Sequence, residues 1–386
     1  MNMKLLYTNF HDGDGGGHTT YIATLARHLG ERHVIDVAVP AGSRLFREIT
    51  TLSERLPNVR AIAQDYPNGL GRLAAARRAR HALRARLREG RYDIVHVNGS
   101  ADHRLALSAL RGLAFDPPSP APRLVWTKHN SKAVGALSAW LRARGTDLAI
   151  AVSEATRREL LGTPYARCAP LTVRNGIDTT HYAPWPADAA QAERARLLGD
   201  AAHDASTLLI GSNAGTAAHK GWMDLLEALA TLPAEVRTRV HVALCGKPFD
   251  ADARARIDAL GLAAQVHHAG MLSDVRPLLA ALDAGFVMSY AVETISFACR
   301  EMMAMGKPVL VSDYAGLPEN ITPDVDGWVV PARDRGAIAE ALRGLLRERE
   351  RLPAMGAAAR AKAAREFGVE TFVSETEAAY LRVLGR

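Results

Sequence analysis

The chain has 386 residues, 48% of them hydrophobic and 23% charged, which is typical of a globular protein with two domains. Its three cysteines, Cys168, Cys245 and Cys299, are few and widely spaced, which excludes a disulfide framework and a cysteine-ligated metal site. The sequence shows neither a signal peptide nor an apolar run of membrane-spanning length, so we expect a cytoplasmic protein.

Charged residues are divided unevenly along the chain. Residues 1–182 contain 26 Lys and Arg against 15 Asp and Glu, a net charge of +11, and the remaining residues contain 22 against 26, a net charge of −4. The basic first half suits an anionic partner such as the cytoplasmic face of the inner membrane. A solvated arginine-rich surface without a partner is the alternative. No nucleic acid partner is expected, because no nucleic-acid-binding module or aromatic platform accompanies the charge.

In the first half, apolar runs of strand length alternate with helical patterns, which predicts a parallel sheet covered by helices on both faces. The expected strands span residues 4–8, 34–39, 59–63, 93–97, 124–127, 148–152 and 171–173, and clear helical patterns span 21–29 and 73–87. Residues 183–203 are rich in Ala, Pro and Asp, which is typical of a linker. A second series of expected strands then spans residues 207–212, 241–245, 265–268, 285–289, 309–312 and 327–330.

These patterns predict an α/β protein with two Rossmann-like parallel-sheet domains that face each other across a cleft. The first domain is expected to span residues 1–182 and the second residues 204–365. The last segment, 366–386, reads as a helix, and we expect it to pack back on the first domain.

A glycine-rich loop follows the first expected strand and leads into a helix near Thr19; its glycines are Gly13, Gly15, Gly16 and Gly17. A dinucleotide-binding fingerprint would require a glycine at the last position of the pattern and an acidic residue at the end of the second strand, and both are missing. The loop is instead suited to the close approach of a phosphate to the backbone.

Two further patterns are interpreted as structural. Asp-x-Asp sequences begin at Asp12, Asp250 and Asp324 in unrelated surroundings, so we interpret them as solvated loop acids and expect no metal. The second pattern is residues 72–91, which contain eight Arg and an apolar stripe made of Leu73, Ala76, Leu83 and Leu87. Such a helix can lie on anionic lipid, but we favour burial of its leucines on the sheet.

The stretch of residues 284–313 predicts a strand–helix–strand unit that carries two carboxylates. After an apolar strand comes a turn with Glu293, and Ser296 or Thr294 can cap a helix that begins near Phe297. Glu293 then lies beyond the carboxyl end of a parallel strand, where open sheets bind ligands, and the positive start of the helix favours an anion. This part of the sequence therefore predicts an anion and sugar site.

These residues resemble a known family. The sequence ETISFACRE, from Glu293 to Glu301, is similar to the Glu-x7-Glu region of retaining glycosyltransferases of family 4, which have the GT-B fold. Further motifs match in order and cover nearly the whole chain: Gly16-Gly17, VSE at 152–154, RNGID at 174–178, Lys220-Gly221, GLPE at 316–319 and Asp326-Gly327. The resemblance implies an acceptor-binding first domain and a nucleotide-sugar-binding second domain.

The resemblance also assigns roles to individual residues. Three residues would be catalytic. Glu293 would hold the hydroxyl groups of the transferred sugar, Lys220 would lie against the diphosphate, and His129 would contact the sugar near the reacting carbon. His129 ends an expected strand, where by itself a histidine is usually only a hydrogen-bonding loop residue. The implied nucleotide-sugar-binding residues are Glu301 at the ribose, the backbone of Thr294, Ile295 and Ser296 at the diphosphate, and Gly16 and Gly17 at the distal phosphate.

One position departs from the family pattern. The family usually has an Arg five residues before the lysine, where this chain has Gly215, and Arg300 is the candidate that supplies the missing charge. Arg300 precedes Glu301 and so points about 100° away from it on a helix.

The predicted function is a retaining, metal-independent transfer of sugar from a nucleotide diphosphate-sugar to an envelope glycan or glycolipid such as lipopolysaccharide. A uridine nucleotide is expected from family frequency, and no cofactor is expected. Two alternatives remain open: a sugar-nucleotide epimerase with the same fold, and a non-catalytic protein that binds membranes through its basic half.

Overall fold

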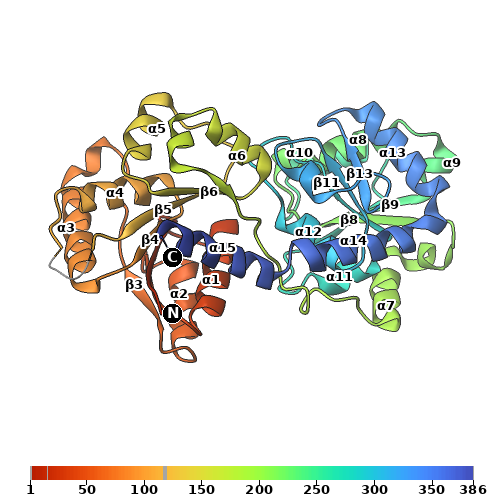
Figure 1. The fold of residues 1–386 in the computed structure, drawn as a ribbon. Coiled ribbons are helices and arrows are strands. Elements are labelled where there is room, and N and C mark those ends of the chain that lie inside the picture. The colour runs from red at the N-terminus through yellow and green to blue at the C-terminus, as the bar shows by residue number, and fades with distance from the viewer. Residues whose placement is uncertain (1, 15, 116–119, 386) are drawn as a thin grey trace. The chain divides into compact units, whose positions relative to one another are not determined.

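The computed structural model describes residues 2–14, 16–115 and 120–385, so Gly15 of the glycine-rich loop lies outside the described residues. The chain forms two compact units, each with its own parallel sheet (Figure 1). The first unit comprises Met1–Gly176 and Val369–Arg386, and the second comprises Ile177–Gly368. The predicted α/β architecture with two Rossmann-like domains is therefore confirmed.

The first unit is built on a seven-stranded parallel sheet with the order β3-β2-β1-β4-β5-β6-β7. Its strands are β1 (Lys4–Thr8), β2 (Val34–Val39), β3 (Val59–Ala63), β4 (Ile94–Val97), β5 (Arg123–Lys128), β6 (Leu148–Ala151) and β7 (Leu171–Thr172). Its α-helices are α1 (Gly17–Leu29), α2 (Arg44–Ser53), α3 (Leu73–Gly90), α4 (Ser100–Leu110), α5 (Ala136–Ala143), α6 (Glu154–Leu161) and α15 (Val369–Val383), and short 3-10 helices span Leu70–Arg72 and Pro164–Cys168. Every strand expected in this half is present, with ends that differ by no more than one residue.

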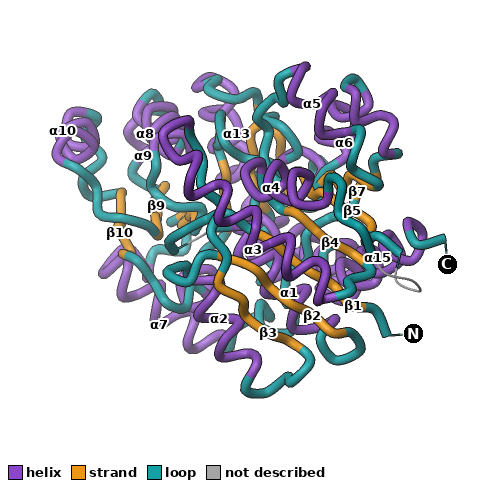
Figure 2. Tube along the Cα trace, turned by 90° about the vertical axis from the view of Figure 1, so that its left-hand side faces the viewer, coloured by secondary structure: helices purple, strands orange, loops and turns teal. Residues whose placement is uncertain are grey.

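Strand residues of the first unit alternate between two cores, one on each face of the sheet. Leu5 and Tyr7 pack with α1, α2 and α15, whereas Leu6 packs with α3, α4, α5 and α6. Figure 2 shows α3 and α4 on one side of the strands and α2 on the other. On α3, Leu83 and Leu87 are buried as expected, but Leu73 is exposed, because it begins the helix ahead of the turns that contact the sheet.

The second unit has a six-stranded parallel sheet with the order β10-β9-β8-β11-β12-β13. Its strands are β8 (Leu208–Ser212), β9 (Val240–Cys245), β10 (Val266–Gly270), β11 (Ala284–Val287), β12 (Val309–Ser312) and β13 (Gly327–Val330). Its α-helices are α7 (Ala187–Leu198), α8 (Trp222–Ala230), α9 (Ala234–Arg237), α10 (Ala251–Ala259), α11 (Arg276–Ala281), α12 (Phe297–Ala304), α13 (Arg335–Arg347) and α14 (Leu352–Glu366). Short 3-10 helices span Gly199–His203, Ala218–Lys220, Leu317–Asn320 and Arg349–Arg351.

The prediction that residues 183–203 form a linker is wrong. Residues 183–203 contain α7 and the following 3-10 helix, and both belong to the second unit. Arg194 on α7 is buried and donates to the carbonyl of Thr207 at 2.8 Å and to Asp283 Oδ2 at 3.1 Å. An Ala-rich composition suits a helix as well as a linker, since Ala has the highest helix propensity. The chain passes between the units at residues 176–177 and 368–369.

The last helix, α15, is part of the first unit. Phe372 and Tyr380 lie in the core formed with α1, and the Tyr380 hydroxyl group is 2.9 Å from the hydroxyl group of Tyr7 on β1 and 2.6 Å from His96 Nδ1 on β4. None of the helices in the described ranges is both long and apolar enough to cross a membrane.

Candidate active site

An ion pair lies beyond the carboxyl ends of two neighbouring strands in the second unit. Lys220 ends the 3-10 helix that follows β8, and its Nζ donates to Glu293 Oε2, in the loop after β11, at 2.7 Å. The Lys220 side chain is 20% exposed and that of Glu293 11%. Because β8 and β11 are the pair at which the strand order reverses, this is the place where an open parallel sheet binds ligands. The predicted position of both residues at one site is therefore seen in the structure.

Further bonds fix the Glu293 carboxylate. Its Oε1 accepts from the backbone amide of Thr294 at 3.2 Å, and Ser289 Oγ lies 3.4 Å from Oε2. The carboxylate thus has donors on both oxygens, and a hydroxyl-bearing ligand would have to compete with these donors or displace Lys220.

The second carboxylate, Glu301 on α12, has its own donors. Asn213, directly after β8, donates through Nδ2 to Glu301 Oε2 at 2.6 Å, and the Tyr182 side chain is also hydrogen-bonded to Glu301. Burial raises the pKa of Glu301, and the bonds from Asn213 and Tyr182 act in the opposite direction. Neither Asn213 nor Tyr182 was found from the sequence. The position of Asn213 at the end of the strand was the available signal, and Tyr182 gave none.

The backbone between Glu293 and α12 is held in an uncommon conformation. Val292 and Ser296 both have φ of 54°, a region that is unfavourable for side chains and especially for β-branched ones. Ser296 caps α12 by accepting from the amide of Cys299 at 3.4 Å, which confirms the predicted cap and the start of the helix at Phe297. The carbonyl of Ile295 accepts from Asn320 Nδ2 at 2.7 Å, so the loop is bonded at its centre as well.

Arg300 does not contribute its charge to this site, and its predicted role at the nucleotide-sugar is wrong. Its side chain is fully buried, its Nε donates to Asn320 Oδ1 at 2.8 Å, and its guanidinium carbon lies 4.1 Å from the centroid of the Phe367 ring. The 100° offset from Glu301 directs the side chain into the core. Arg300 instead holds Asn320, which in turn holds the carbonyl of Ile295.

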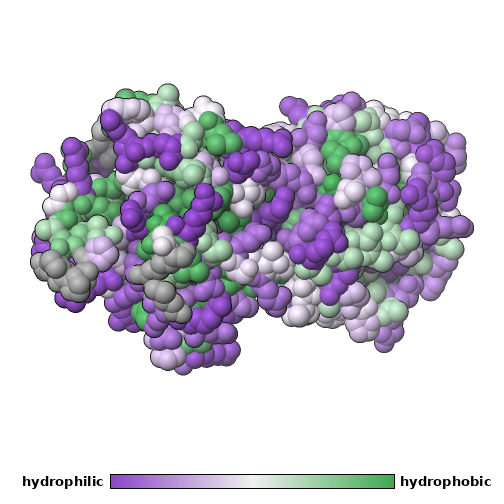
Figure 3. Space-filling view, viewed as in Figure 1, coloured by the Kyte–Doolittle hydropathy of each residue, from purple (hydrophilic) through white to green (hydrophobic). Residues whose placement is uncertain are grey.

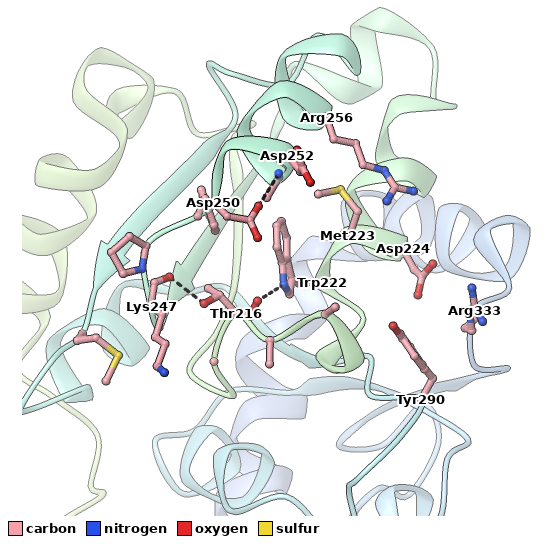
Figure 4. Close-up of a pocket in the computed structure, with 18 of the residues that line it drawn as sticks. Thr216, Trp222, Met223, Asp224, Lys247, Asp250, Asp252, Arg256, Tyr290 and Arg333 are labelled. Atoms are coloured by element: carbon pink, nitrogen blue, oxygen red, sulfur yellow. Dashed lines mark hydrogen bonds between the residues drawn. The ribbon is translucent and has the colours of Figure 1, made fainter. Parts of the chain in front are cut away.

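A cavity of about 740 Å³ lies beside the loop that carries Lys220, between α8, α10 and the residues after β13 (Figure 4). Thr216 forms part of its wall and is held by a 2.8 Å bond to the carbonyl of Lys247 and a 2.9 Å bond from Trp222 Nε1. The cavity has the size of a small-molecule site. Lys247 and Met271 line the cavity, but the pair Lys220 and Glu293 does not.

In the first unit, His129 directly follows β5 and is fixed by Asn98, which follows β4. Asn98 Nδ2 donates to the carbonyls of Thr8 and His96 at 3.2 and 3.3 Å, so its Oδ1 must accept from His129 Nε2, which is 2.9 Å away. The arrangement assigns the proton of His129 to Nε2. Asn98 follows β4, which pairs with β1 where this sheet reverses its strand order, and His129 follows the next strand, β5, so both residues lie at the carboxyl edge where open parallel sheets bind ligands.

Aromatic rings surround His129. The rings of His18 and Tyr21, both on α1, lie 4.3 and 4.5 Å from the His129 ring, centroid to centroid. Burial, then the neighbouring His18, His96 and His11, lower the pKa of His129 well below its usual range, and burial lowers that of His18 to about 4. Both imidazoles are therefore neutral near pH 7. No partner of His18 could be assigned from the sequence.

Gly16 precedes α1 with φ of 179°, an extended conformation open to any residue, and a Cβ at this position would meet no atom within 4 Å. Gly17 is the first residue of the helix. The fold thus gives no steric reason for a glycine at position 16.

Comparison with known proteins identifies the family. The model named Glycosyltransferase Family 4 matches residues 15–181, and Glycosyl transferases group 1 matches residues 202–362. This chain belongs to glycosyltransferase family 4. The matches cover both units, and the implied GT-B fold is confirmed by solved structures.

Individual relatives agree with this assignment. The GDP-mannose-dependent alpha-(1-6)-phosphatidylinositol monomannoside mannosyltransferase of Mycobacterium tuberculosis is 27% identical over 390 residues, which cover 93% of each chain. The lipopolysaccharide core biosynthesis mannosyltransferase LpsB of Rhizobium meliloti is 26% identical and covers 67% of this chain and 72% of that one. The structure of Anabaena HepE in complex with UDP and glucose has a TM-score of 0.79 at 20% identity, with 98% of this chain and 99% of that chain covered, which shows the likeness of fold.

The glycosyltransferase departs from its family at Gly215 for a reason visible in the backbone. Gly215 has φ of 93°, which side chains other than glycine rarely adopt, so an Arg at this position would require a different loop. Gly221, next to Lys220, is required more directly, because its φ is 69° and a Cβ would lie 1.9 Å from the carbonyl oxygen of Met288. Within the described ranges, no three His, Cys, Asp or Glu side chains are grouped to hold a metal ion.

Proposed function

We propose that this glycosyltransferase moves a sugar from a nucleotide diphosphate-sugar to a glycan or lipid-linked acceptor at the cytoplasmic face of a membrane, with retention of configuration and without a metal. The observation that carries the proposal is the 2.7 Å pair of Lys220 and Glu293 at the strand-order reversal of the second unit. Such a pair offers one cation for a diphosphate and one carboxylate for sugar hydroxyls.

Donor binding would separate the pair. Lys220 Nζ would exchange the Glu293 carboxylate for a phosphate oxygen, and Glu293 would then accept hydrogen bonds from sugar hydroxyls. As the bond from the anomeric carbon to the phosphate oxygen breaks, the electron pair of that bond passes to the diphosphate, whose negative charge grows. The Lys220 ammonium group therefore stabilises the transition state more than it stabilises the bound donor. Glu301, held by Asn213, would accept from the ribose hydroxyls.

The transfer step follows from the same groups. The acceptor hydroxyl oxygen forms the new bond to the anomeric carbon on the face that the diphosphate leaves, and its proton passes to the departing phosphate oxygen. The rival route is a double displacement through a carboxylate nucleophile. Glu293 is the candidate nucleophile, and its bond from the Thr294 amide, together with its proposed place at the sugar hydroxyls, favours a positioning role over attack.

On the acceptor side, neutral His129 with its proton fixed on Nε2 presents no positive charge to the anomeric carbon, which becomes positive in the transition state. Gly16 leaves open space before α1 for an oxygen of the distal phosphate. The first unit therefore contributes groups for the transfer, whereas Lys220 and Glu301 bind the nucleotide.

An experiment can distinguish two candidate donors, a uridine nucleotide-sugar and a guanosine nucleotide-sugar. The expectation of a uridine nucleotide rests on family frequency, and the name of the M. tuberculosis relative supports GDP-mannose as the competing donor. A thermal-shift panel of UDP-, GDP-, ADP- and CDP-sugars separates them, because the cognate donor raises the melting temperature by mass action. For the acceptor, the names of the relatives support a lipid-linked inositol glycan or a lipopolysaccharide core.

The proposal is tested with Lys220→Ala and Glu293→Ala, using the donor found in the panel. Removal of either group should lower kcat by about 100-fold or more, the usual cost of losing one charge-stabilising contact in a transition state. The matched controls are Glu193→Ala and Arg196→Ala, which break an exposed ion pair of the same length on α7 and should leave kcat unchanged. Transfer that survives both site variants would contradict the proposal, and conversion of the nucleotide sugar without any acceptor would identify an epimerase instead.

A further inference from the structure

Helix α5 of the first unit carries large apolar side chains on the face that points to water. Leu137 is 72% exposed, Trp140 47% and Leu141 57%, and their spacing of three and four residues places them on one side of the helix. Figure 3 shows hydrophobic surface over the end of the first unit that carries α5 in Figure 1. Large apolar residues gathered on an exposed face are typical of an interaction surface.

The opposite face of α5 attaches the helix to the unit with small residues. Ala139 and Ala143 are buried in the core shared with α4 and β5, and the carbonyl of Ala143 lies 3.5 Å from Cys168 Sγ. The Leu137, Trp140 and Leu141 side chains are thus not needed to hold the helix in place. A helix whose large apolar side chains serve only to stabilise the fold would place its leucines against the core.

Cations flank this apolar face. Arg144, one turn after Trp140, places its guanidinium carbon 4.1 Å from the centroid of the Trp140 ring, and Lys132 is exposed in the loop before the helix. Arg167 is exposed on the 3-10 helix whose Cys168 contacts α5. Of the nearby acids, Glu159 lies 3.6 Å from Lys128 Nζ and Asp147 lies 3.1 Å from Arg123, so these two are paired with cations already. The whole first unit has 28 Lys and Arg against 17 Asp and Glu, a net charge of +11.

We propose that α5 is a membrane-docking helix that inserts Leu137, Trp140 and Leu141 between the headgroups of an anionic phospholipid bilayer. An apolar face with an aromatic residue, rimmed by Lys and Arg, is the combination that binds such an interface. The proposal rests on the proposed function in one respect only, because a lipid-linked acceptor gives the docking its purpose. Among the described residues, Lys132, Arg144 and Arg167 form no ion pair with an acid, which favours lipid phosphates over a protein as their partner.

The position of α5 along the chain connects docking to the site. The six residues between His129 and Ala136 form the loop that leads into α5, and Lys128 Nζ holds this loop by donating to the carbonyls of Asn130 and Lys132, both at 2.7 Å. The loop that begins at the predicted catalytic histidine therefore ends at the docking helix, which brings lipid-linked acceptors to the side of the unit that carries His129.

The test is sedimentation with vesicles, using the full chain and no donor. Vesicles of phosphatidylglycerol and phosphatidylethanolamine should bind the protein, and neutral phosphatidylcholine vesicles should not. The triple variant Leu137→Ser/Trp140→Ser/Leu141→Ser should weaken binding to anionic vesicles by about tenfold or more. The variant lacks the three apolar side chains whose transfer from water into the bilayer favours binding. The charge variant Lys132→Glu/Arg144→Glu should weaken it by about tenfold as well, and high salt should reproduce that loss.

Leu73→Ser is the matched control, since this leucine is 64% exposed on α3 of the same unit. It should bind vesicles like the unchanged protein, and melting temperatures should show that all variants are folded. Equal vesicle binding by the triple variant, or loss of binding in Leu73→Ser alone, overturns the proposal. A triple variant that changes only the oligomeric state would identify the face as an interface between copies and overturn it too. Because vesicle binding needs no turnover, failure of the proposed transfer reaction is seen separately, in the donor assay.

Discussion

At the scale of single residues, the site combines side chains that the sequence indicates with others that it does not. Glu293, Lys220 and His129 each follow a strand, and strand ends can be read from apolar runs. The partners of Glu301, Asn213 and Tyr182, and the partner of His129, Asn98, could not be assigned, because a pairing between residues far apart in sequence depends on strand order and backbone direction. Arg300 was assigned a role from its charge, although its offset of about 100° from Glu301 was readable from the sequence, and its burial excludes that role.

Gly16 allows a prediction that separates function from folding. A Cβ at Gly16 meets no protein atom and its φ of 179° suits alanine, so Gly16→Ala should change the free energy of unfolding by no more than about 0.5 kcal/mol. If the open space receives a phosphate oxygen, the same methyl group should lower kcat/KM by about tenfold or more. Steady-state kinetics and denaturant unfolding measure both quantities.

Gly135→Ala supplies the control for this experiment. Gly135 also precedes a helix of the first unit, and a Cβ there is equally free of contacts. Assayed with a soluble acceptor, this variant should keep normal kinetics. Equal kinetics in both variants would show that Gly16 does not approach the donor.

At the scale of elements, strands were predictable and the junction between the units was not. Apolar runs bounded by turn residues located each strand, and Ser296 located the start of α12. The segment 183–203 was misassigned because Ala and Pro occur both in linkers and at the start of helices. The tertiary contacts of Arg194 and the burial of Leu198 in the core of the second unit show that α7 is a packed helix.

The link from α12 to the loop before it can be measured as a coupling energy. Arg300 donates to Asn320, and Asn320 donates to the carbonyl of Ile295, so Arg300 acts as a positioning residue for the Glu293 loop. Arg300→Met, Asn320→Leu and the double variant form a double-mutant cycle. We expect a coupling of about 2 kcal/mol in denaturant unfolding, as for a buried hydrogen bond to a charged group.

The same variants distinguish positioning from simple stabilisation. If the bonds hold the backbone that carries Glu293, the variants should raise the donor KM at temperatures where they remain fully folded. Lys362→Met is the comparison, because this mostly buried lysine, near Asp326, donates to Thr322 and not to the loop. Loss of stability with an unchanged KM would restrict Arg300 to a structural role.

At the scale of the whole molecule, the two units repeat one design. The strand orders β3-β2-β1-β4-β5-β6 and β10-β9-β8-β11-β12-β13 correspond strand for strand, and in each unit an Asn that follows a strand at the order reversal bonds a predicted site residue. Asn98 bonds His129 in the first unit, and Asn213 bonds Glu301 in the second. The sequence predicts the repetition of sheets, because both halves alternate in the same way, but not this repetition of polar contacts.

The first unit should lose stability in mild acid because it buries neutral histidines. Burial lowers the pKa of His18 to about 4 and that of His96 to about 3, whereas a histidine in the unfolded chain titrates near 6.5. Between these values the unfolded state binds protons that the folded state does not, so stability falls as pH decreases below about 6.5 and levels off near the folded pKa. Above pH 6.5 both states are neutral and the effect vanishes. Asp102 opposes the trend in part, since burial raises its pKa to about 6.

His18→Asn isolates one contribution to this acid sensitivity. At pH 5 the folded-state pKa of about 4 corresponds to a cost of about 2 kcal/mol for His18 alone. Removing the imidazole should therefore reduce the loss of melting temperature between pH 7.5 and pH 5, while His81→Asn, at an exposed position on α3, should leave that loss unchanged. Calorimetry at the two pH values measures the difference. An identical acid shift in the unchanged protein and in His18→Asn would mean that His18 can take up a proton in the folded state, and that the ring cluster around His129 opens to water.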